Sequence, residues 1–177
     1  MGTAPWVGPI RVLDDPDSPA VYISWNDAKA FITTLNGLTG ERFRLPTEAE
    51  WEYACRGGAT TEYYFGDSSA NLSDYAWYLE NASAGHDRNS HVVGQLLPNA
   101  FGLFDMYGNV YEWCEDWYDS GYYSTSTGID PRGPTSGSDR VVRGGSYVSA
   151  ASDCRSAVRY GFDPSYAVMF YGFRLAR

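Results

Sequence analysis

The chain has 177 residues, a length that suits a single domain with a buried core of its own. Its formal net charge is −9 and no run of Lys or Arg occurs, which argues against nucleic acid as a partner, because a phosphate backbone requires a basic surface. No apolar run reaches the roughly 20 residues of a membrane-spanning helix. The first residues lack the basic and apolar regions of a signal peptide. We therefore expect a soluble chain without membrane insertion.

Residues 1–20 contain four prolines and predict an extended lead-in, and residues 21–177 predict one domain. The apolar residues 21–23 predict a short strand. Ser24, with an Asp three residues later, then predicts the start of a helix, because both side chains can accept free backbone N–H groups. We expect Gly37 or Gly40 to end this helix.

A second helix is predicted by Thr47-Glu-Ala-Glu50, a capping box that follows a proline, and Gly57-Gly58 closes it. The rest of the chain predicts short strands and long loops. Gly108-Asn109 indicates a tight turn into a strand that contains Trp113. The loop from Asp119 to Ser138 is long for a compact domain, and such loops are usually functional or mobile. Two helices followed by a loop-rich, antiparallel β half predict an α+β fold.

The three cysteines, Cys55, Cys114 and Cys154, show no metal-binding spacing, and an odd number cannot all pair within the chain. Distance along the sequence does not forbid one disulfide between two of them, so that alternative stays open. We favour three buried free thiols.

Residues 140–177 alternate between ordered blocks and irregular ones. Arg143-Gly-Gly-Ser146 and Gly172-Phe-Arg-Leu175 are rich in Gly and Arg, whereas the aromatic and small residues between them follow neither a helical nor a strand period. Aromatic rings give rigid contact area and small polar residues give adaptable hydrogen bonds, a combination typical of binding surfaces. The alternative is that the aromatic residues belong to the core, namely Tyr160, Phe162, Tyr166 and Phe170.

Several of these blocks resemble the formylglycine-generating enzyme, or sulfatase-modifying factor, family. The resemblance runs from about residue 20 to the end of the chain and implies an elaborated C-type-lectin-like fold. It is carried by Ser24-Trp-Asn-Asp-Ala28, Arg44-Leu-Pro-Thr-Glu-Ala-Glu-Trp-Glu-Tyr-Ala54, Asn99-Ala-Phe-Gly-Leu103, Gly108-Asn-Val-Tyr-Glu-Trp113, Arg143-Gly-Gly-Ser146 and Gly172-Phe-Arg-Leu175.

The formylglycine-generating enzymes use two cysteines, five residues apart, to bind copper and activate oxygen. An ungapped alignment places them at Ser149 and Cys154. A hydroxyl is a far poorer ligand for Cu(I) than a thiolate. The sequence therefore predicts no catalytic residue and no enzyme. The alternative is a divergent, copper-dependent oxidoreductase of the formylglycine-generating type that acts on a protein cysteine.

The chain also resembles the variable proteins of diversity-generating retroelements, in which a C-terminal C-type-lectin-like domain presents diversified residues as a ligand-binding surface. This resemblance implies a non-enzymatic protein whose region 140–177 binds a protein or glycan on another surface. A purely structural accessory domain is a weaker alternative. The implied ligand-binding residues are Tyr147, Val148, Ser149, Ala150, Ser152, Asp153, Val158, Tyr160, Gly161, Phe162, Ser165, Tyr166, Ala167 and Val168.

Members of the family can also hold calcium at the block that here begins with Gly108. Gly108, Val110 and Glu112 match those positions, and the carbonyl of Tyr107 is a candidate fourth ligand. The alternative for Glu112 is a structural ion pair with Arg143 or Arg174. No other cofactor is expected, and the two histidines, His86 and His91, are interpreted as solvated loop residues.

Overall fold

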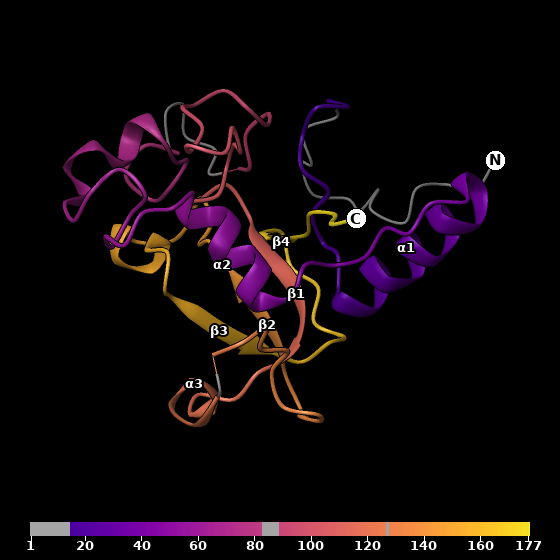
Figure 1. The fold of residues 1–177 in the computed structure, drawn as a ribbon. Coiled ribbons are helices and arrows are strands. Elements are labelled where there is room, and N and C mark those ends of the chain that lie inside the picture. Colours follow the sequence, from indigo (N-terminus) through magenta and orange to yellow (C-terminus); the bar gives the residue numbers. More distant parts are fainter. Residues whose placement is uncertain (1–14, 83–88, 127) are drawn as a thin grey trace.

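The computed structural model describes residues 15–82, 89–126 and 128–177, and a four-stranded sheet lies at its centre (Figure 1). The strand order is β3-β2-β1-β4, so β3 and β4 form the two edges. Most of the predicted lead-in, together with His86, lies outside the described residues. The strands are β1 (Tyr111–Trp117), β2 (Arg140–Arg143), β3 (Arg159–Phe162) and β4 (Tyr171–Gly172).

The sheet is mixed. β2 pairs antiparallel with β1 and with β3, as predicted, whereas β4 pairs parallel with β1. The expectation of a wholly antiparallel half is therefore corrected at β4. After β3, residues 163–170 lead the chain past the sheet to the other side of β1, where β4 runs parallel to β1. The α+β class itself is confirmed.

The two long helices begin and end where the sequence predicts. α1 (Trp25–Thr39) starts with a capping box at Ser24, and α2 (Glu48–Arg56) starts with one at Thr47, so free N–H groups of both first turns have side-chain acceptors. Each helix ends at a glycine in the left-handed region, Gly40 after α1. α2 lies against β1 and β2, and α1 lies on the other side of β1 (Figure 1).

Two local expectations differ from the structure. The predicted strand over 21–23 is absent, because Tyr22 has a φ of 57°, which no strand residue adopts. Short helical pieces, too brief to show a period, interrupt the loop-rich half. No helix in the described ranges is long and apolar enough to cross a membrane. The short pieces are η1 (Ser69–Asp74), α3 (Tyr122–Thr125) and η2 (Ala151–Cys154).

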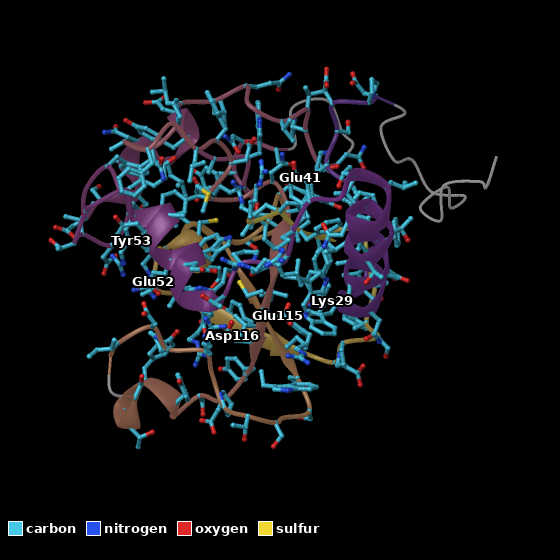
Figure 2. The ribbon with its side chains drawn as sticks, turned by 45° about the vertical axis from the view of Figure 1, so that its right-hand side comes forward. Lys29, Glu41, Glu52, Tyr53, Glu115 and Asp116 are labelled. Atoms are coloured by element: carbon cyan, nitrogen blue, oxygen red, sulfur yellow. The ribbon has the colours of Figure 1, made fainter. Side chains whose placement is uncertain are left out.

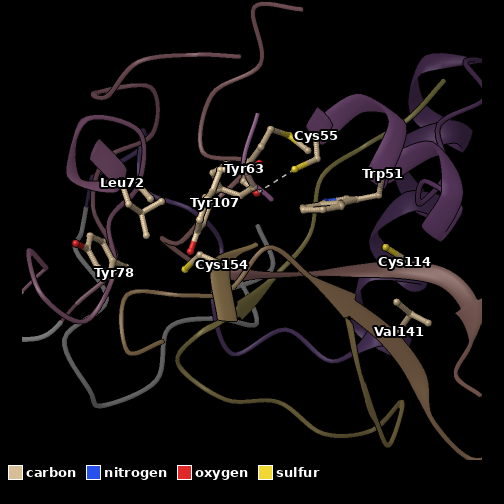
Figure 3. Close-up of a cluster of buried hydrophobic side chains, with 11 residues drawn as sticks. Trp51, Cys55, Tyr63, Leu72, Tyr78, Tyr107, Cys114, Val141 and Cys154 are labelled. Carbon is tan, nitrogen blue, oxygen red and sulfur yellow. Dashed lines mark hydrogen bonds between the residues drawn. The ribbon is translucent and has the colours of Figure 1, made fainter. Parts of the chain in front are cut away.

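The sheet separates two hydrophobic clusters, because neighbouring strand residues point to opposite faces. Val141 belongs to the cluster under α2, with Trp51, and Val142 belongs to the cluster under α1, with Trp113. Figure 3 shows the first cluster, in which all three cysteines are fully buried. They are free thiols, as favoured above.

The turn before β1 also forms as predicted. Gly108 has a φ of 68°, and a Cβ there would lie 2.1 Å from the carbonyl oxygen of Trp77. Only glycine allows this close approach. Asn109 then donates its N–H to the same carbonyl at 2.7 Å. The turn thereby ties β1 to a segment 30 residues earlier and fixes the strand that carries the candidate site.

Candidate functional site

A network of buried ions holds α2 to the sheet. Arg143 of β2 is 0% exposed, and its guanidinium donates to Glu52 and to the carbonyls of Val158 and Ser156. Glu48, also buried, accepts two hydrogen bonds of 2.6 Å from Arg159 of β3. Paired and hydrogen-bonded charges of this kind tolerate burial, but removal of one partner leaves the other unpaired.

Asp116 completes this network at the start of α2 (Figure 2). Its Oδ2 accepts the backbone N–H of Glu48 at 2.8 Å, while Oδ1 has no hydrogen-bond partner among the described residues. Burial raises the pKa of the Asp116 carboxyl to about 6, and nearby Glu48 and Glu115 contribute in the same direction. We refer to Glu48, Glu52, Asp116, Arg143 and Arg159 as the buried ion network.

Aromatic rings gather at the C-terminal segment, where several pack against the hydrophobic cluster under α1. The ring of Phe162 lies 6.1 Å from Tyr166 and 5.1 Å from Tyr171, between ring centres. Tyr111 lies 6.0 Å from Tyr160. A sixth ring, Phe170, contacts both Tyr111 and Tyr171. Tyr171 is buried, and the other rings are partly or largely exposed. We call the exposed and half-exposed rings the aromatic surface: Tyr111, Tyr160, Phe162, Tyr166 and Phe170.

A turn places Tyr166 on this surface. Asp163 accepts the backbone N–H of Tyr166 at 2.9 Å, and its carboxylate accepts both the N–H and the hydroxyl of Ser165. Pro164 sets the φ that the second position of such a turn requires. The side chain of Tyr166 is consequently 49% exposed.

Twelve of the predicted ligand-binding residues reach solvent, fully or in part, and two do not. Two residues of the first group contact each other: the hydroxyl of Tyr160 donates a hydrogen bond to the carboxylate of Asp153 at 3.0 Å. Their role in binding stays a prediction. The exposed residues are Ala150, Ser152, Ser165, Tyr166 and Ala167, and the half-buried ones are Val148, Asp153, Val158, Tyr160, Gly161, Phe162 and Val168.

The prediction that Tyr147 and Ser149 contact a ligand does not agree with the structure, because both side chains are buried. Tyr147 is 1% exposed, and its N–H donates to the carbonyl of Asn109 at 2.9 Å, which draws the residue into the core. The hydroxyl of Ser149 accepts the N–H of Ser146 and donates to Tyr111. Neither side chain can contact a ligand from solvent in this conformation.

The copper site implied by the resemblance does not fit these residues. Ser149 supplies a hydroxyl that already has two hydrogen-bond partners. Cys154 is buried, and burial raises the pKa of its thiol to about 12. Ser149 and Cys154 together supply at most one thiolate, whereas Cu(I) is bound through a pair of them.

Two of the residues expected to hold calcium, Val110 and Glu112, line a cavity of about 400 Å³, whereas Gly108 is not among its lining residues. Glu112 pairs with Arg174 through two hydrogen bonds of 2.5 and 2.6 Å, while Trp51 donates to the same carboxylate. Of the two alternative partners of Glu112, the ion pair is thus made with Arg174. Gly108 and Val110 are buried, so they can offer only their carbonyls.

Asp105, which the sequence reasoning missed, also lines this cavity. Its Oδ1 is buried without a hydrogen-bond partner among the described residues. Burial raises the pKa of Asp105. This carboxylate oxygen without a donor is the type of ligand that a hard cation prefers, whereas both oxygens of Glu112 already accept hydrogen bonds from Arg174 or Trp51. The signal in the sequence is a single carboxylate within an apolar run, Leu103-Phe-Asp-Met106.

Comparison with known proteins identifies a family that shares this architecture. Residues 8–177 match the model of the sulfatase-modifying factor enzyme 1-like domain. The formylglycine-generating enzyme of Bos taurus is 35% identical over 200 residues, with 99% of this chain and 52% of that protein covered. The enzyme of the same name from Streptomyces coelicolor is 40% identical over 173 residues, with 91% and 53% covered. The chain thus spans about half the length of these relatives.

A solved structure confirms the second resemblance. Treponema denticola variable protein 1 has a TM-score of 0.81 at 31% identity, with 95% of this chain and 74% of that chain covered. The fold is therefore that of the C-type-lectin-like variable proteins and of the formylglycine-generating enzymes, as predicted.

The relatives correct one expectation. The sequence predicted that the chain is not an enzyme, whereas the curated proteins that it matches at 35–40% identity are enzymes. That prediction gave more weight to Ser149, which stands in place of one of the two cysteines, than to the rest of the similarity. The chain belongs to the family of the sulfatase-modifying factor enzyme 1-like domain.

Proposed function

We propose that this chain binds a protein or glycan on another surface through its aromatic surface, as a variable-type member of the family. The observation that carries this proposal is the placement of Tyr166, a large aromatic ring presented to solvent by a hydrogen-bonded turn within the region of irregular sequence. Aromatic anchors of this type dominate the binding energy of protein interfaces. The likeness to the Treponema denticola variable protein supports the same assignment.

The residues around Tyr166 suit this role. Met169 is exposed, and Ser165 and Ala167 present small groups on either side of the ring. Below them, Tyr171 contacts Phe162, Tyr166 and Phe170, so a buried ring supports the rings above it. A supported ring loses little conformational freedom when a ligand binds, which preserves affinity.

A binding experiment tests the proposal. The chain is used to select ligands from a displayed protein library and to probe a glycan array, and each ligand is measured again with Tyr166→Ser. We expect at least a tenfold loss of affinity, because an interface anchor contributes about 2 kcal/mol or more. Leu38→Ser is the matched control, since Leu38 is an exposed apolar residue of α1, and it should leave affinity unchanged. Equal effects of the two substitutions would contradict the proposal.

A second candidate function is the one in the relatives' names, the generation of formylglycine, here on a protein cysteine. Identities of 35–40% to those enzymes favour it. The test is to incubate the chain with a cysteine-containing peptide and a thiol reductant in air, with and without copper, and to detect an aldehyde by mass spectrometry. The peptide carbon and the reductant each supply two electrons to O2, and sulfide and water are released. Aldehyde formed by the unmodified chain and lost in Cys154→Ala would support this function. Aldehyde that appears only after Ser149→Cys would show that the missing thiol prevents it.

A further inference from the structure

The outer edge of the sheet has backbone groups without partners. β3 pairs with β2 on one side only, with Tyr160 opposite Val142 and Gly161 opposite Val141. In an antiparallel pair, every second residue directs its N–H and C=O away from its neighbour. Within the described residues, no group outside the sheet hydrogen-bonds to the backbone of β3. Figure 1 shows β3 as the outer border of the sheet, on the side opposite β4.

This edge is accessible to solvent. Gly161 has no side chain and is still partly exposed, so its accessible surface belongs to the main chain. The ring of Tyr118 covers the face of Gly161, where a Cβ would lie 2.4 Å from ring atom Cγ. Part of the Gly161 main chain away from Tyr118 is therefore open to solvent.

The edge also lacks the features that usually prevent pairing. Proteins protect edge strands with Lys, Pro, bulges or covering loops. β3 contains no proline, and its one charged residue, Arg159, is held by Glu48 and by the carbonyl of Asp119. The sequence from Tyr160 to Phe162 carries no charge, and Pro164 lies beyond the end of the strand.

We propose that an extended polypeptide segment of the ligand adds to the sheet as a fifth strand, beside β3. This inference rests on the proposed function and narrows its ligand to a protein. A main chain presents N–H and C=O at the spacing of the edge, whereas a glycan does not. Tyr160 and Phe162, which both belong to the aromatic surface, lie on this strand and contact the side chains of the added segment.

The charge near the edge defines the chemistry of that segment. Asp163, next to the end of β3, is fully exposed, and Arg159 is neutralised by Glu48. A basic residue in the segment would complement Asp163. β2 itself, Arg140-Val-Val-Arg143, shows that β3 pairs with such a sequence on its inner side. A blocked peptide with an Arg-Val-Val-Arg core is accordingly the probe.

The test compares this peptide with two analogues that carry backbone N-methyl groups at alternate residues. In an added strand only one alternate set of N–H groups faces β3. We expect one analogue to bind at least tenfold more weakly and the other to bind like the parent peptide. We also expect hydrogen exchange of the β3 amides to slow when the parent peptide is present, as measured by NMR. Equal affinity of the two analogues, or no binding at millimolar peptide, would overturn the proposal.

Two further outcomes separate this inference from the proposed function. If Tyr166→Ser abolishes binding of a selected ligand while the β3 amides stay unprotected, the edge inference fails and the proposed function stands. If neither Tyr166 nor β3 affects any ligand, both fail. A dimer in sedimentation that protects the same amides and excludes the peptide would assign the edge to a second copy and overturn the peptide proposal.

Discussion

The buried ion network and the aromatic surface both use residues of β1 and β3 but are held in opposite ways. Arg143 makes hydrogen bonds to three different residues and is fully buried, so its geometry is fixed by partners on α2 and beyond β2. Tyr166 makes no side-chain hydrogen bond within the described residues and packs against the rings of Phe162 and Tyr171. The comparison teaches that this fold can keep one set of side chains constant while a neighbouring set is free to change.

Loss of Arg143 should break the network most severely. Arg143→Ala leaves Glu48 buried with one partner fewer, so we expect a loss of about 3–5 kcal/mol in the free energy of unfolding. Urea denaturation followed by tryptophan fluorescence measures it. Arg56→Ala is the control, because Arg56 pairs with Glu52 at the surface of α2 and should cost less than about 1 kcal/mol. Similar losses for both variants would contradict this account of the network.

A second pair of substitutions compares a buried ring with an exposed one. Tyr171→Ala removes a side chain that is 1% exposed, and we expect a cost of about 3–5 kcal/mol. Tyr166→Ala should cost less than about 1 kcal/mol, since most surface substitutions lie within that range. Thermal unfolding of the two variants measures the difference. If Tyr166→Ala destabilised the fold as much as Tyr171→Ala, the aromatic surface would be core.

The sequence predicted the framework better than the surface. Capping boxes at Ser24 and Thr47, and the turn at Gly108, are local signals, and all three formed as predicted. The burial of Tyr147 follows instead from a backbone hydrogen bond to Asn109, a contact between distant parts of the chain. No local pattern encodes such a contact, so the sequence could not separate Tyr147 from the exposed residues that follow it.

The ion pair of Glu112 also depends on contacts that no local sequence pattern encodes. The partner of Glu112 was narrowed to Arg143 or Arg174 from the sequence, but only the register between β1 and β2 and the parallel return of β4 decide between them. Arg143 lies opposite Glu112 in the sheet but turns toward Glu52. The direction of the Arg143 side chain thus settles which arginine pairs with Glu112, and that direction depends on the packing of α2.

A pH titration tests the acidic member of the network. The pKa of Asp116 is raised to about 6 from an ordinary 3.8, so between these values the folded protein binds a proton that the unfolded chain releases. Asp116 therefore contributes stability below about pH 4, and this contribution is lost as the pH rises through 6. Relative to Asp116→Asn, the unmodified chain should lose up to about 3 kcal/mol between pH 4 and 7. A difference that stays constant or rises with pH would contradict the assignment.

A smaller effect than those of the buried groups is expected for calcium. We propose that Asp105, Glu112 and the carbonyls of Gly108 and Val110 hold the ion when it is present. At a calcium concentration about ten times the dissociation constant, the gain in unfolding free energy would be about 1.4 kcal/mol. The melting temperature in calcium and in chelator measures this gain, and Asp105→Ala should remove it. An equal gain in the variant would place the ion elsewhere.

The most direct test of the account is a library in which the five exposed predicted positions are randomised together. These are Ala150, Ser152, Ser165, Tyr166 and Ala167. We expect most members to fold with melting temperatures close to that of the unmodified chain, and some to bind new protein ligands. A parallel library at Tyr147 and Ser149, which are buried, should mostly fail to fold. If the two libraries lost folded members equally, the C-terminal region would not be a surface of exchangeable side chains.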